Sequence, residues 1–253
     1  MRATILGGSA AGPNPGAGCS GLLVAEGDAR VVLDLGPGTL AELFAHVHPA
    51  EISGIVLSHM HQDHWLDLIP LRYRLKYAPA AGGFKIPLHL PPGGKALLDS
   101  VARVFSEGDD HAAFFGGVFE MSEYVPADGL TIAGMPISFA PTVHPVPCWM
   151  MRVQNGGGDF GYTADTGVNP DAVAFMNGVR CLVVEATWLR PNAPGSHLTA
   201  AEAGQLASDC SAVETVLCHL WAENDRAELL KDSSENYRGR LHIAEPGLTI
   251  GWR

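Results

Sequence analysis

The chain has 253 residues, of which 47% are hydrophobic and 17% are charged, a globular composition rather than a disordered one. Its 27 acidic residues outnumber the 16 lysines and arginines and give a formal net charge of −11, which argues against the broad basic face that a large nucleic-acid footprint needs. We therefore expect no large nucleic-acid partner, although this charge does not exclude a small phosphate ester.

No targeting or membrane segment is evident. The first 20 residues contain one arginine and no long apolar run, so we expect no signal peptide. No stretch reaches the ~20 apolar residues of a membrane span. The five cysteines are scattered without a CxxC pair, which is typical of reduced thiols. We expect a cytoplasmic protein without a membrane partner, folded as a single domain over residues 1–253, and a homodimer is compatible with the sequence.

The first half of the chain is predicted to be β-rich with inserted helices. The Gly27-Asp28 pair is a hairpin turn signal. Thr39, with Glu42 three residues later, predicts a capping box that opens a helix. A short apolar run at Ala3–Leu6 precedes strands predicted at Gly21–Ala25, Val31–Leu35 and Ile55–Leu57. Helices are predicted over 40–47, 66–77 and 95–105, and a loop over 106–117.

The second half alternates strands and helices. Strands are predicted at Leu130–Ala133, Ile137–Ala140, Met150–Val153, Phe160–Thr163, Cys181–Glu185, Thr215–Cys218 and Leu248–Gly251. Helices are predicted over 171–176, over 225–231, and from a Thr199/Glu202 capping box to about residue 208. This order predicts two mixed halves with sheets inside and helices outside.

The strongest chemical signal is Ser58-His59-Met60-His61-Gln62-Asp63-His64, directly after a predicted strand. Residues i and i+2 project to the same side of an extended chain, so His59 and His61 can converge on one ion. Asp63 and His64 lie where the chain turns toward a helix and can face a second ion. Imidazole and carboxylate suit Zn²⁺ well, and Mn²⁺ or Fe²⁺ less selectively. Four solvated polar residues in a helix-entry loop are a much weaker explanation of this spacing.

Other ligand candidates also follow predicted strands. His144, Asp165 and His219 each end one, and each alone is as compatible with a capping or surface role as with a ligand role. Together with the histidine cluster they complete a two-metal site in which Asp165 could bridge. Asp34, at the end of its strand, either forms a turn or orients a ligand histidine.

The motif set resembles the metallo-β-lactamase superfamily, and it extends over nearly the whole chain. The matching residues are Asp34-Leu35-Gly36, His59-x-His61-x-Asp63-His64, His144, Asp165 and His219. The resemblance implies an α+β fold, a four-layer αββα sandwich with the site at one edge of its two sheets. It also implies two divalent metal ions, the first bound by three histidines, the second by a carboxylate and two histidines, with one bridging carboxylate. The implied ligands are His59, His61 and His144; Asp63, His64 and His219; and Asp165.

Within this superfamily the chain is similar to the ribonuclease Z-like branch. The resemblance rests on the glycine-rich N-terminal loop, on Val184-Glu185-Ala186-Thr187-Trp188 and on Ser196-His197-Leu198-Thr199. It implies that His197, supported by Glu185, lies near the scissile phosphate, so that Asp63, His197 and Glu185 are the catalytic candidates. His197 could instead only flank the helix that Thr199 opens, and Glu185 could only cap a neighbour.

The chain differs from ribonuclease Z proper in one segment. Ribonuclease Z proper carries a tRNA-gripping arm between its third and fourth motifs, whereas here two predicted strands nearly fill the segment from His144 to Asp165. The chain therefore looks more like armless relatives that include the atypical class II cyclic-nucleotide phosphodiesterases. The resemblance implies hydrolysis of a small or cyclic phosphodiester by a metal-bridging hydroxide. The alternatives are a lactonase or other ester hydrolase with the same ligands and, more remotely, a non-enzymatic metal-binding module.

Residues beyond the motifs give weaker signals. Arg72 and Lys76 share one helix face by their i, i+4 spacing, and with Arg74 they could meet a phosphate, although a solvated face is the commoner role for such residues. Trp149 and Trp188 could stack on a base, although most such residues belong to a core. The natural substrate is not encoded in any motif.

Overall fold

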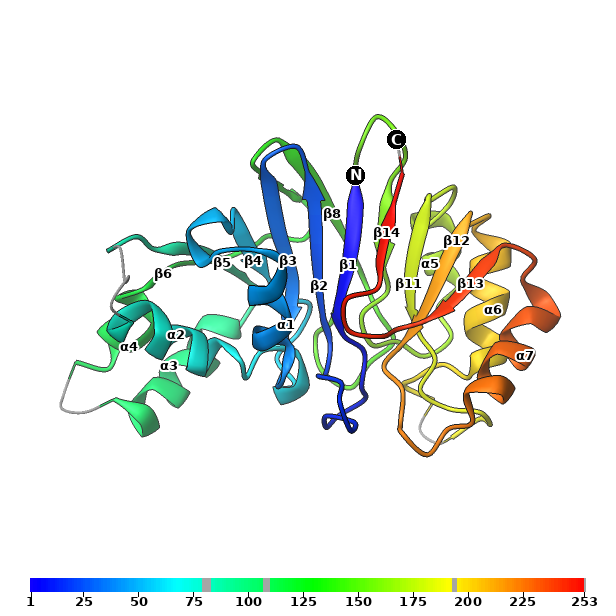
Figure 1. The fold of residues 1–253 in the computed structure, drawn as a ribbon, viewed down its shortest axis with the longest axis horizontal. Helices are drawn as coiled ribbons and strands as arrows, with labels where there is room; N and C mark the ends of the chain where they lie inside the picture. The colour runs from blue at the N-terminus through cyan, green and yellow to red at the C-terminus, as the bar shows by residue number, and fades with distance from the viewer. Residues whose placement is uncertain (79–82, 107–109, 193–194, 253) are drawn as a thin grey trace.

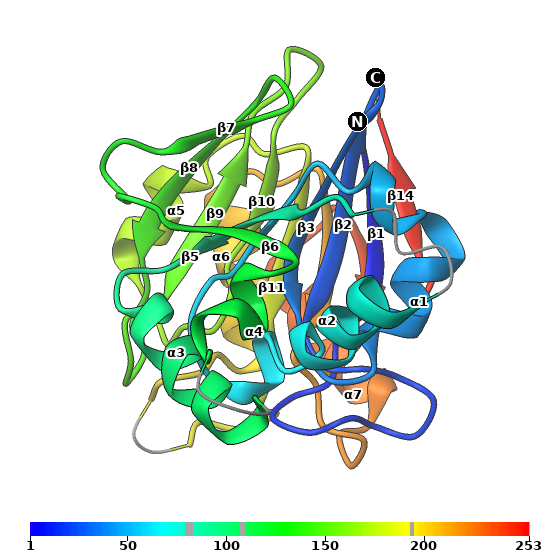
Figure 2. The same ribbon diagram turned by 90° about the vertical axis from the view of Figure 1, so that its left-hand side faces the viewer.

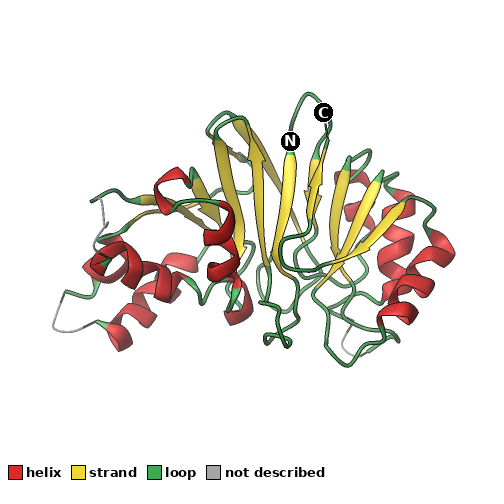
Figure 3. Ribbon diagram, viewed as in Figure 1, coloured by secondary structure: helices red, strands yellow, loops and turns green. Residues whose placement is uncertain are grey.

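The computed structural model describes residues 1–78, 83–106, 110–192 and 195–252. Two seven-stranded sheets face each other, and helices cover the outer face of each (Figures 1 and 3). The strand order is β14-β1-β2-β3-β4-β5-β6 in the first sheet and β13-β12-β11-β10-β9-β8-β7 in the second. The expected αββα sandwich is confirmed.

The first sheet and its helices use the first half of the chain and one late strand. The strands are β1 (Arg2–Gly7), β2 (Gly21–Glu26), β3 (Ala29–Leu35), β4 (Gly54–Val56), β5 (Ile86–Leu90), β6 (Phe119–Glu123) and β14 (Thr249–Gly251). The helices are α1 (Thr39–His46), α2 (Leu68–Tyr77), α3 (Gly94–Phe105) and α4 (Ala112–Gly116), with short 3₁₀ turns at Pro49–Glu51 and Gln62–His64.

The second sheet and its helices follow in sequence. Its strands are β7 (Leu130–Ile132), β8 (Met135–Pro141), β9 (Trp149–Val153), β10 (Phe160–Tyr162), β11 (Cys181–Glu185), β12 (Glu214–Cys218) and β13 (Arg240–Ile243). Its helices are α5 (Pro170–Phe175), α6 (Ala200–Asp209) and α7 (Arg226–Asn236). The predicted capping box of α6 is confirmed, because the Thr199 side chain accepts from the Glu202 N–H and the Glu202 carboxylate accepts from the Thr199 N–H.

Three apolar clusters hold the four layers together. One fills the space between the sheets and includes Val31, Phe160 and Val216. A second lies between the first sheet and its helices, and a third lies between the second sheet and its helices. Strands β11 and β12 are buried along their whole length, as expected for parallel strands covered on both faces. No helix in the described part of the chain is long and apolar enough to cross a membrane.

The structure differs from the sequence predictions at five places. Strands β5, β6 and β13 were not predicted, and α4 lies where the sequence predicted a loop; residues 107–109 of that loop lie outside the described residues. The first residue outside α1 is Gly38, in the left-handed conformation (φ 87°), and not the expected Thr39. The Thr39 hydroxyl instead donates to the Gly36 carbonyl. The Leu40 N–H is satisfied by the Asp67 carboxylate, 2.8 Å away.

Candidate metal centre

The ends of strands from both sheets meet at one edge of the sandwich and carry the polar side chains. From the first sheet, Asp34 ends β3, and Ser58 to His64 follow β4. From the second sheet, His144 follows β8, Asp165 follows β10, Glu185 ends β11 and His219 follows β12. Strands β3 and β4 are parallel, and so are β10, β11 and β12, so their carboxyl ends lie at the same edge.

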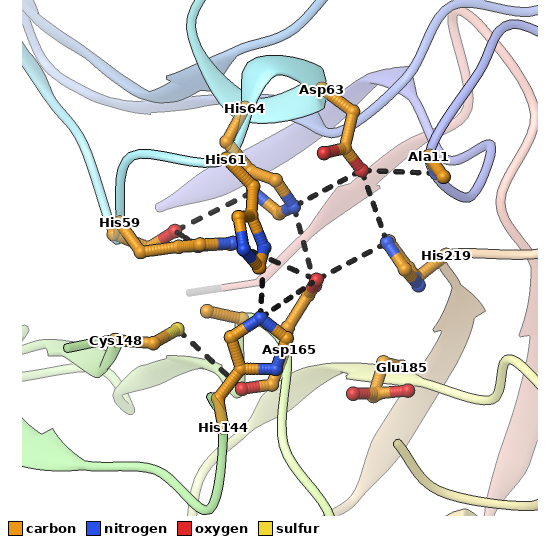
Figure 4. Close-up of polar contacts among 12 residues, drawn as sticks. Ala11, His59, His61, Asp63, His64, His144, Cys148, Asp165, Glu185 and His219 are labelled. Carbon is orange, nitrogen blue, oxygen red and sulfur yellow. Dashed lines mark hydrogen bonds and ion pairs between the residues drawn. The ribbon is translucent and has the colours of Figure 1, made fainter. Parts of the chain in front are cut away.

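The first cluster is His59, His61, His144 and Asp165, and their nitrogen and oxygen atoms point toward one another (Figure 4). His61 Nδ1 lies 2.9 Å from His144 Nε2. Asp165 Oδ2 lies 3.7 Å from His59 Nε2 and 4.0 Å from His144 Nε2. Three imidazoles and a carboxylate in this arrangement could hold one metal ion.

The second cluster is Asp63, His64, Asp165 and His219, all of them buried. His219 Nε2 lies 3.2 Å from Asp63 Oδ2 and 3.3 Å from Asp165 Oδ2, and His64 Nε2 lies 3.3 Å from Asp165 Oδ1 (Figure 4). Asp165 belongs to both clusters. One carboxylate thus lies between two groups of histidines, and each group takes histidines from both sheets.

A buried carboxylate of the first sheet, Asp34, positions two of these histidines. Its Oδ2 lies 2.7 Å from His64 Nδ1 and also accepts the Ser58 hydroxyl at 2.7 Å. Since that hydroxyl donates to Asp34, it accepts from His59 Nδ1, 3.0 Å away. Tyr162 donates a third hydrogen bond to Asp34 Oδ2 at 2.9 Å. Both histidines are therefore fixed with Nε2 free to face the cluster.

Glu185 plays the same part for the second sheet. Its Oε1 lies 3.1 Å from His197 Nδ1, and its Oε2 accepts the Thr187 hydroxyl at 2.7 Å. The Thr187 oxygen in turn lies 2.7 Å from His219 Nδ1. Each sheet thus supplies one buried carboxylate that holds one histidine directly and a second one through a hydroxyl. Because Thr187 donates its proton to Glu185, His219 donates from Nδ1, and in the neutral form of its ring the unprotonated Nε2 faces the second cluster.

The backbone is strained at three positions of this edge. Asp34, Ala164 and His219 have φ of 58°, 50° and 55°, a left-handed conformation that costs non-glycine residues free energy. Such strain persists only where surrounding contacts fix the chain. Here it aims the Asp34 and His219 side chains into the site and turns the chain directly before Asp165.

The two clusters differ in their affinity for protons. Burial holds the pKa of His59 well below its usual range and lowers the pKa of His144 to about 4. In the second cluster burial is again the largest single effect and lowers the pKa, but the surrounding carboxylates together outweigh it. Asp165 and Asp34 raise the pKa of His64, and Asp165, Asp63 and Glu185 raise that of His219. The first cluster is therefore neutral imidazole at pH 7, whereas the second attracts a positive charge.

Buried polar atoms without a hydrogen-bond partner indicate whether metal ions fit this site. Among the described residues, His59 Nε2, His64 Nε2 and Asp165 Oδ1 are buried without a hydrogen-bond partner. A buried polar atom without a partner is costly, and these three are lone-pair donors that face the two clusters. Divalent cations would satisfy them, and imidazole with carboxylate is a donor set that zinc favours.

A model of the beta-lactamase superfamily domain matches residues 29–220, a range that contains every residue of both clusters. The chain belongs to the beta-lactamase superfamily. The expected resemblance is thereby confirmed, and the chain carries His and Asp clusters able to bind metal.

Relatives within the superfamily cover almost the whole chain. The probable metallo-hydrolase YhfI of Bacillus subtilis is 27% identical over 251 residues, which is 98% of each protein. The crystal structure of that YhfI has a TM-score of 0.87 to this chain over 98% of both. A ribonuclease Z of Myxococcus xanthus is 23% identical and covers 99% of this chain and 97% of its own. These matches agree with the ribonuclease Z-like branch that the motifs indicate.

The structure brings together all the residues predicted to bind metal or to act in catalysis. Besides the two clusters, Glu185, His197 and His219 form a third group whose polar atoms lie within 4.8 Å of one another. Sequence reasoning missed Ser58, Thr187 and Tyr162 as contributors. Thr187 stands two residues beyond Glu185, a spacing that places both on one side of extended chain, and this was the available signal. No sequence signal pointed to Tyr162, because its hydrogen bond to Asp34 joins strands of two different sheets.

Proposed function

We propose that the protein is a hydrolase of small or cyclic phosphodiesters that works with two divalent metal ions, most suitably zinc, with manganese or iron as alternatives. The observation that carries the proposal is the shared Asp165, which lies between two ligand clusters with His197 beside them. The His197 ring stacks on the ring of His219, with centroids 5.1 Å apart and an interplanar angle of 11°, and its centroid lies 5.2 Å from that of His144.

The residues divide into holding and reacting groups. The first cluster would hold one ion and Asp63, His64 and His219 the other, with Asp165 bridging them. Bound there, two divalent ions lower the pKa of water to produce a nucleophile near pH 7 and neutralise charge on the phosphate oxygens. Asp63 is kept in place by the Ala11 N–H, which donates to its Oδ2 at 3.0 Å.

His197 is the candidate proton donor. Its Nδ1 is held by Glu185, and its side chain is 20% exposed whereas that of Glu185 is fully buried. The ring can therefore present Nε2–H toward a departing alkoxide while Glu185 stabilises the imidazolium. An acid at this position serves a phosphodiester with a poor leaving group.

A small substrate is favoured over a long RNA. The segment between His144 and Asp165 consists of the short loops around β9 and the adjoining strand β10, so it contains no inserted arm. The net charge of −11 also disfavours a polyanion. The Myxococcus relative is named for cleavage of RNA, and what we transfer from it is the bond type, not the size of the substrate.

The test is a substrate panel with metal-loaded protein: bis(p-nitrophenyl) phosphate, cyclic AMP and an acyl-homoserine lactone. We expect turnover of at least one phosphodiester and none of the lactone. His59→Ala removes a proposed ligand. It should abolish the activity and reduce the metal content. Arg74→Ala, on an exposed part of α2, is the matched control and should retain both. Hydrolysis of the lactone alone would replace the proposal with the ester-hydrolase alternative.

A further inference from the structure

A cavity of about 260 Å³ is lined by residues of α2, α4 and the end of α3. These three helices lie next to one another on the outer side of the first sheet (Figure 2). Two cations and four aromatic rings contribute to its lining: Arg72, Lys76, Tyr73, Tyr77, Phe105 and Phe114. None of these residues belongs to a candidate metal cluster. We call this cavity the Arg72 pocket.

Arg72 is the central feature of the pocket. It is only 5% exposed, in contrast to the solvated position expected from sequence. Its Nε donates to the Phe114 carbonyl at 3.0 Å. Its guanidinium carbon lies 4.2 Å from the centre of the Phe114 ring and 4.7 Å from that of the Tyr73 ring. Among the described residues Arg72 makes no ion pair, and Nε makes its one side-chain hydrogen bond.

An arginine this buried is normally paired with an acid. The chain has 27 acidic residues and 16 basic ones, so acidic residues that could pair with Arg72 are not scarce. Among the described residues of the lining the one acid is Asp110, and its Oδ1 is occupied by the Ala113 N–H. Lys76, exposed at the rim, adds a second cation and also forms no ion pair within the described residues. The described lining thus contains two cations without an ion pair and a single acid.

The aromatic rings at the rim define a second part of the site. Tyr73, Tyr77 and Phe105 are 40%, 64% and 43% exposed. Large exposed rings grouped around a cation are typical of surfaces that stack on a planar ligand. A guanidinium fork with a nearby ammonium matches the oxygens of a phosphate.

We propose that the Arg72 pocket binds a small phosphate ester that carries a planar ring, of the nucleoside monophosphate class. The phosphate lies against Arg72 and Lys76, and the ring stacks on the exposed aromatic faces. The proposal does not rest on the function assigned to the metal centre, since none of its residues is shared with that site.

The test is isothermal titration of the metal-loaded protein with AMP, adenosine and inorganic phosphate as separate probes. Lys76→Glu reverses a charge at the pocket rim. Arg74→Glu makes the same change in net charge on the same helix, but Arg74 packs over Phe44 and does not line the pocket. We expect Lys76→Glu to weaken AMP binding about tenfold or more and Arg74→Glu to leave it within about twofold. Arg72→Met, which keeps the bulk of the stem, should abolish this binding.

The outcomes separate the pocket from the metal centre. AMP that binds only at the metal centre would be weakened equally by both charge reversals, or by neither, and that result overturns the proposal. Adenosine should bind detectably and phosphate more weakly than AMP. If phosphate alone binds as tightly as AMP, the stacking part of the proposal is wrong. Should Arg72→Met fail to fold, the comparison of Lys76→Glu with Arg74→Glu still decides.

Discussion

Thr187→Val removes one hydroxyl from the centre of a buried network and tests how the second cluster is held. The Thr187 oxygen lies 2.7 Å from both Glu185 Oε2 and His219 Nδ1. Valine has nearly the same shape, so the change deletes two hydrogen bonds without leaving a large cavity. Thr187→Ser restores the hydroxyl and serves as the matched variant.

The expected loss of stability depends on which groups Thr187→Val leaves without a hydrogen-bond partner. His219 Nδ1–H loses its acceptor in a buried position, and an unsatisfied buried group costs about 1–3 kcal/mol. Glu185 Oε2 still accepts from the Leu198 N–H at 3.1 Å, so losing the Thr187 hydrogen bond should cost Glu185 only the lower end of that range. We therefore expect a decrease of about 2–4 kcal/mol in the free energy of unfolding of the metal-free protein. Metal affinity should fall about 10- to 100-fold because His219 is no longer fixed.

Guanidinium unfolding of the metal-free variants measures the first quantity, and competition with a chromogenic chelator measures the second. Thr131→Val, at an exposed position of β7, is the control and should change the stability by less than about 0.5 kcal/mol. A Thr187→Val protein with wild-type stability and metal affinity would show that the hydroxyl bridge contributes nothing. If Thr187→Ser restores neither the stability nor the metal affinity, the effect of Thr187→Val comes from altered packing and not from the lost hydroxyl.

Three further predictions concern the metal centre. Elemental analysis of active protein should find about two equivalents of metal, and a single equivalent in fully active protein would contradict the shared role of Asp165. His197→Ala should keep its metal but lose about 10²–10⁴ in rate on a substrate with an alkoxide leaving group, and less with p-nitrophenolate; equal losses on both substrates would assign His197 to phosphate positioning. Acidification from about pH 7.5 to 5.5 should release the ion of the second cluster first, because protons compete for His64 and His219. The neighbouring carboxylates together raise the pKa of these two histidines in spite of burial, whereas burial lowers the pKa of His59. Dialysed protein should therefore pass through a one-equivalent state, and simultaneous loss of both ions would refute this order.

The elements that sequence reasoning missed share a physical reason. Strand β5 contains Pro87, which lacks a donor for the ladder and argues against a central strand. Strand β6 has a single buried residue, Phe119, so it shows no alternation. Strand β13 is half-exposed along three of its four residues. Helix α4 has five residues, too few for a helical period. In each case the tertiary partner and not the local pattern fixes the structure.

The candidate site was more predictable than these elements because its residues are close in sequence or stand at strand ends. The spacing of His59, His61, Asp63 and His64 is local, and it alone predicts convergence on metal. The strand-end position of Asp165 allowed a bridging role, and the family resemblance then implied it, since no local pattern relates Asp165 to His59–His64. The hydroxyl bridges depend on side-chain rotamers. The Asp67 carboxylate that caps α1 acts across 27 residues, beyond the reach of any capping pattern.

The short strand β14 has a consequence for biosynthesis. Although residues 249–251 come after all the strands of the second sheet, they pair with β1 and form the outer edge of the first sheet (Figure 1). The Met1 ammonium also donates to the Trp252 carbonyl. While the chain is still on the ribosome, β1 therefore presents an uncovered backbone edge, which is a template for pairing with other chains. Until residues 249–251 have emerged, this edge of β1 stays uncovered and can pair with other chains.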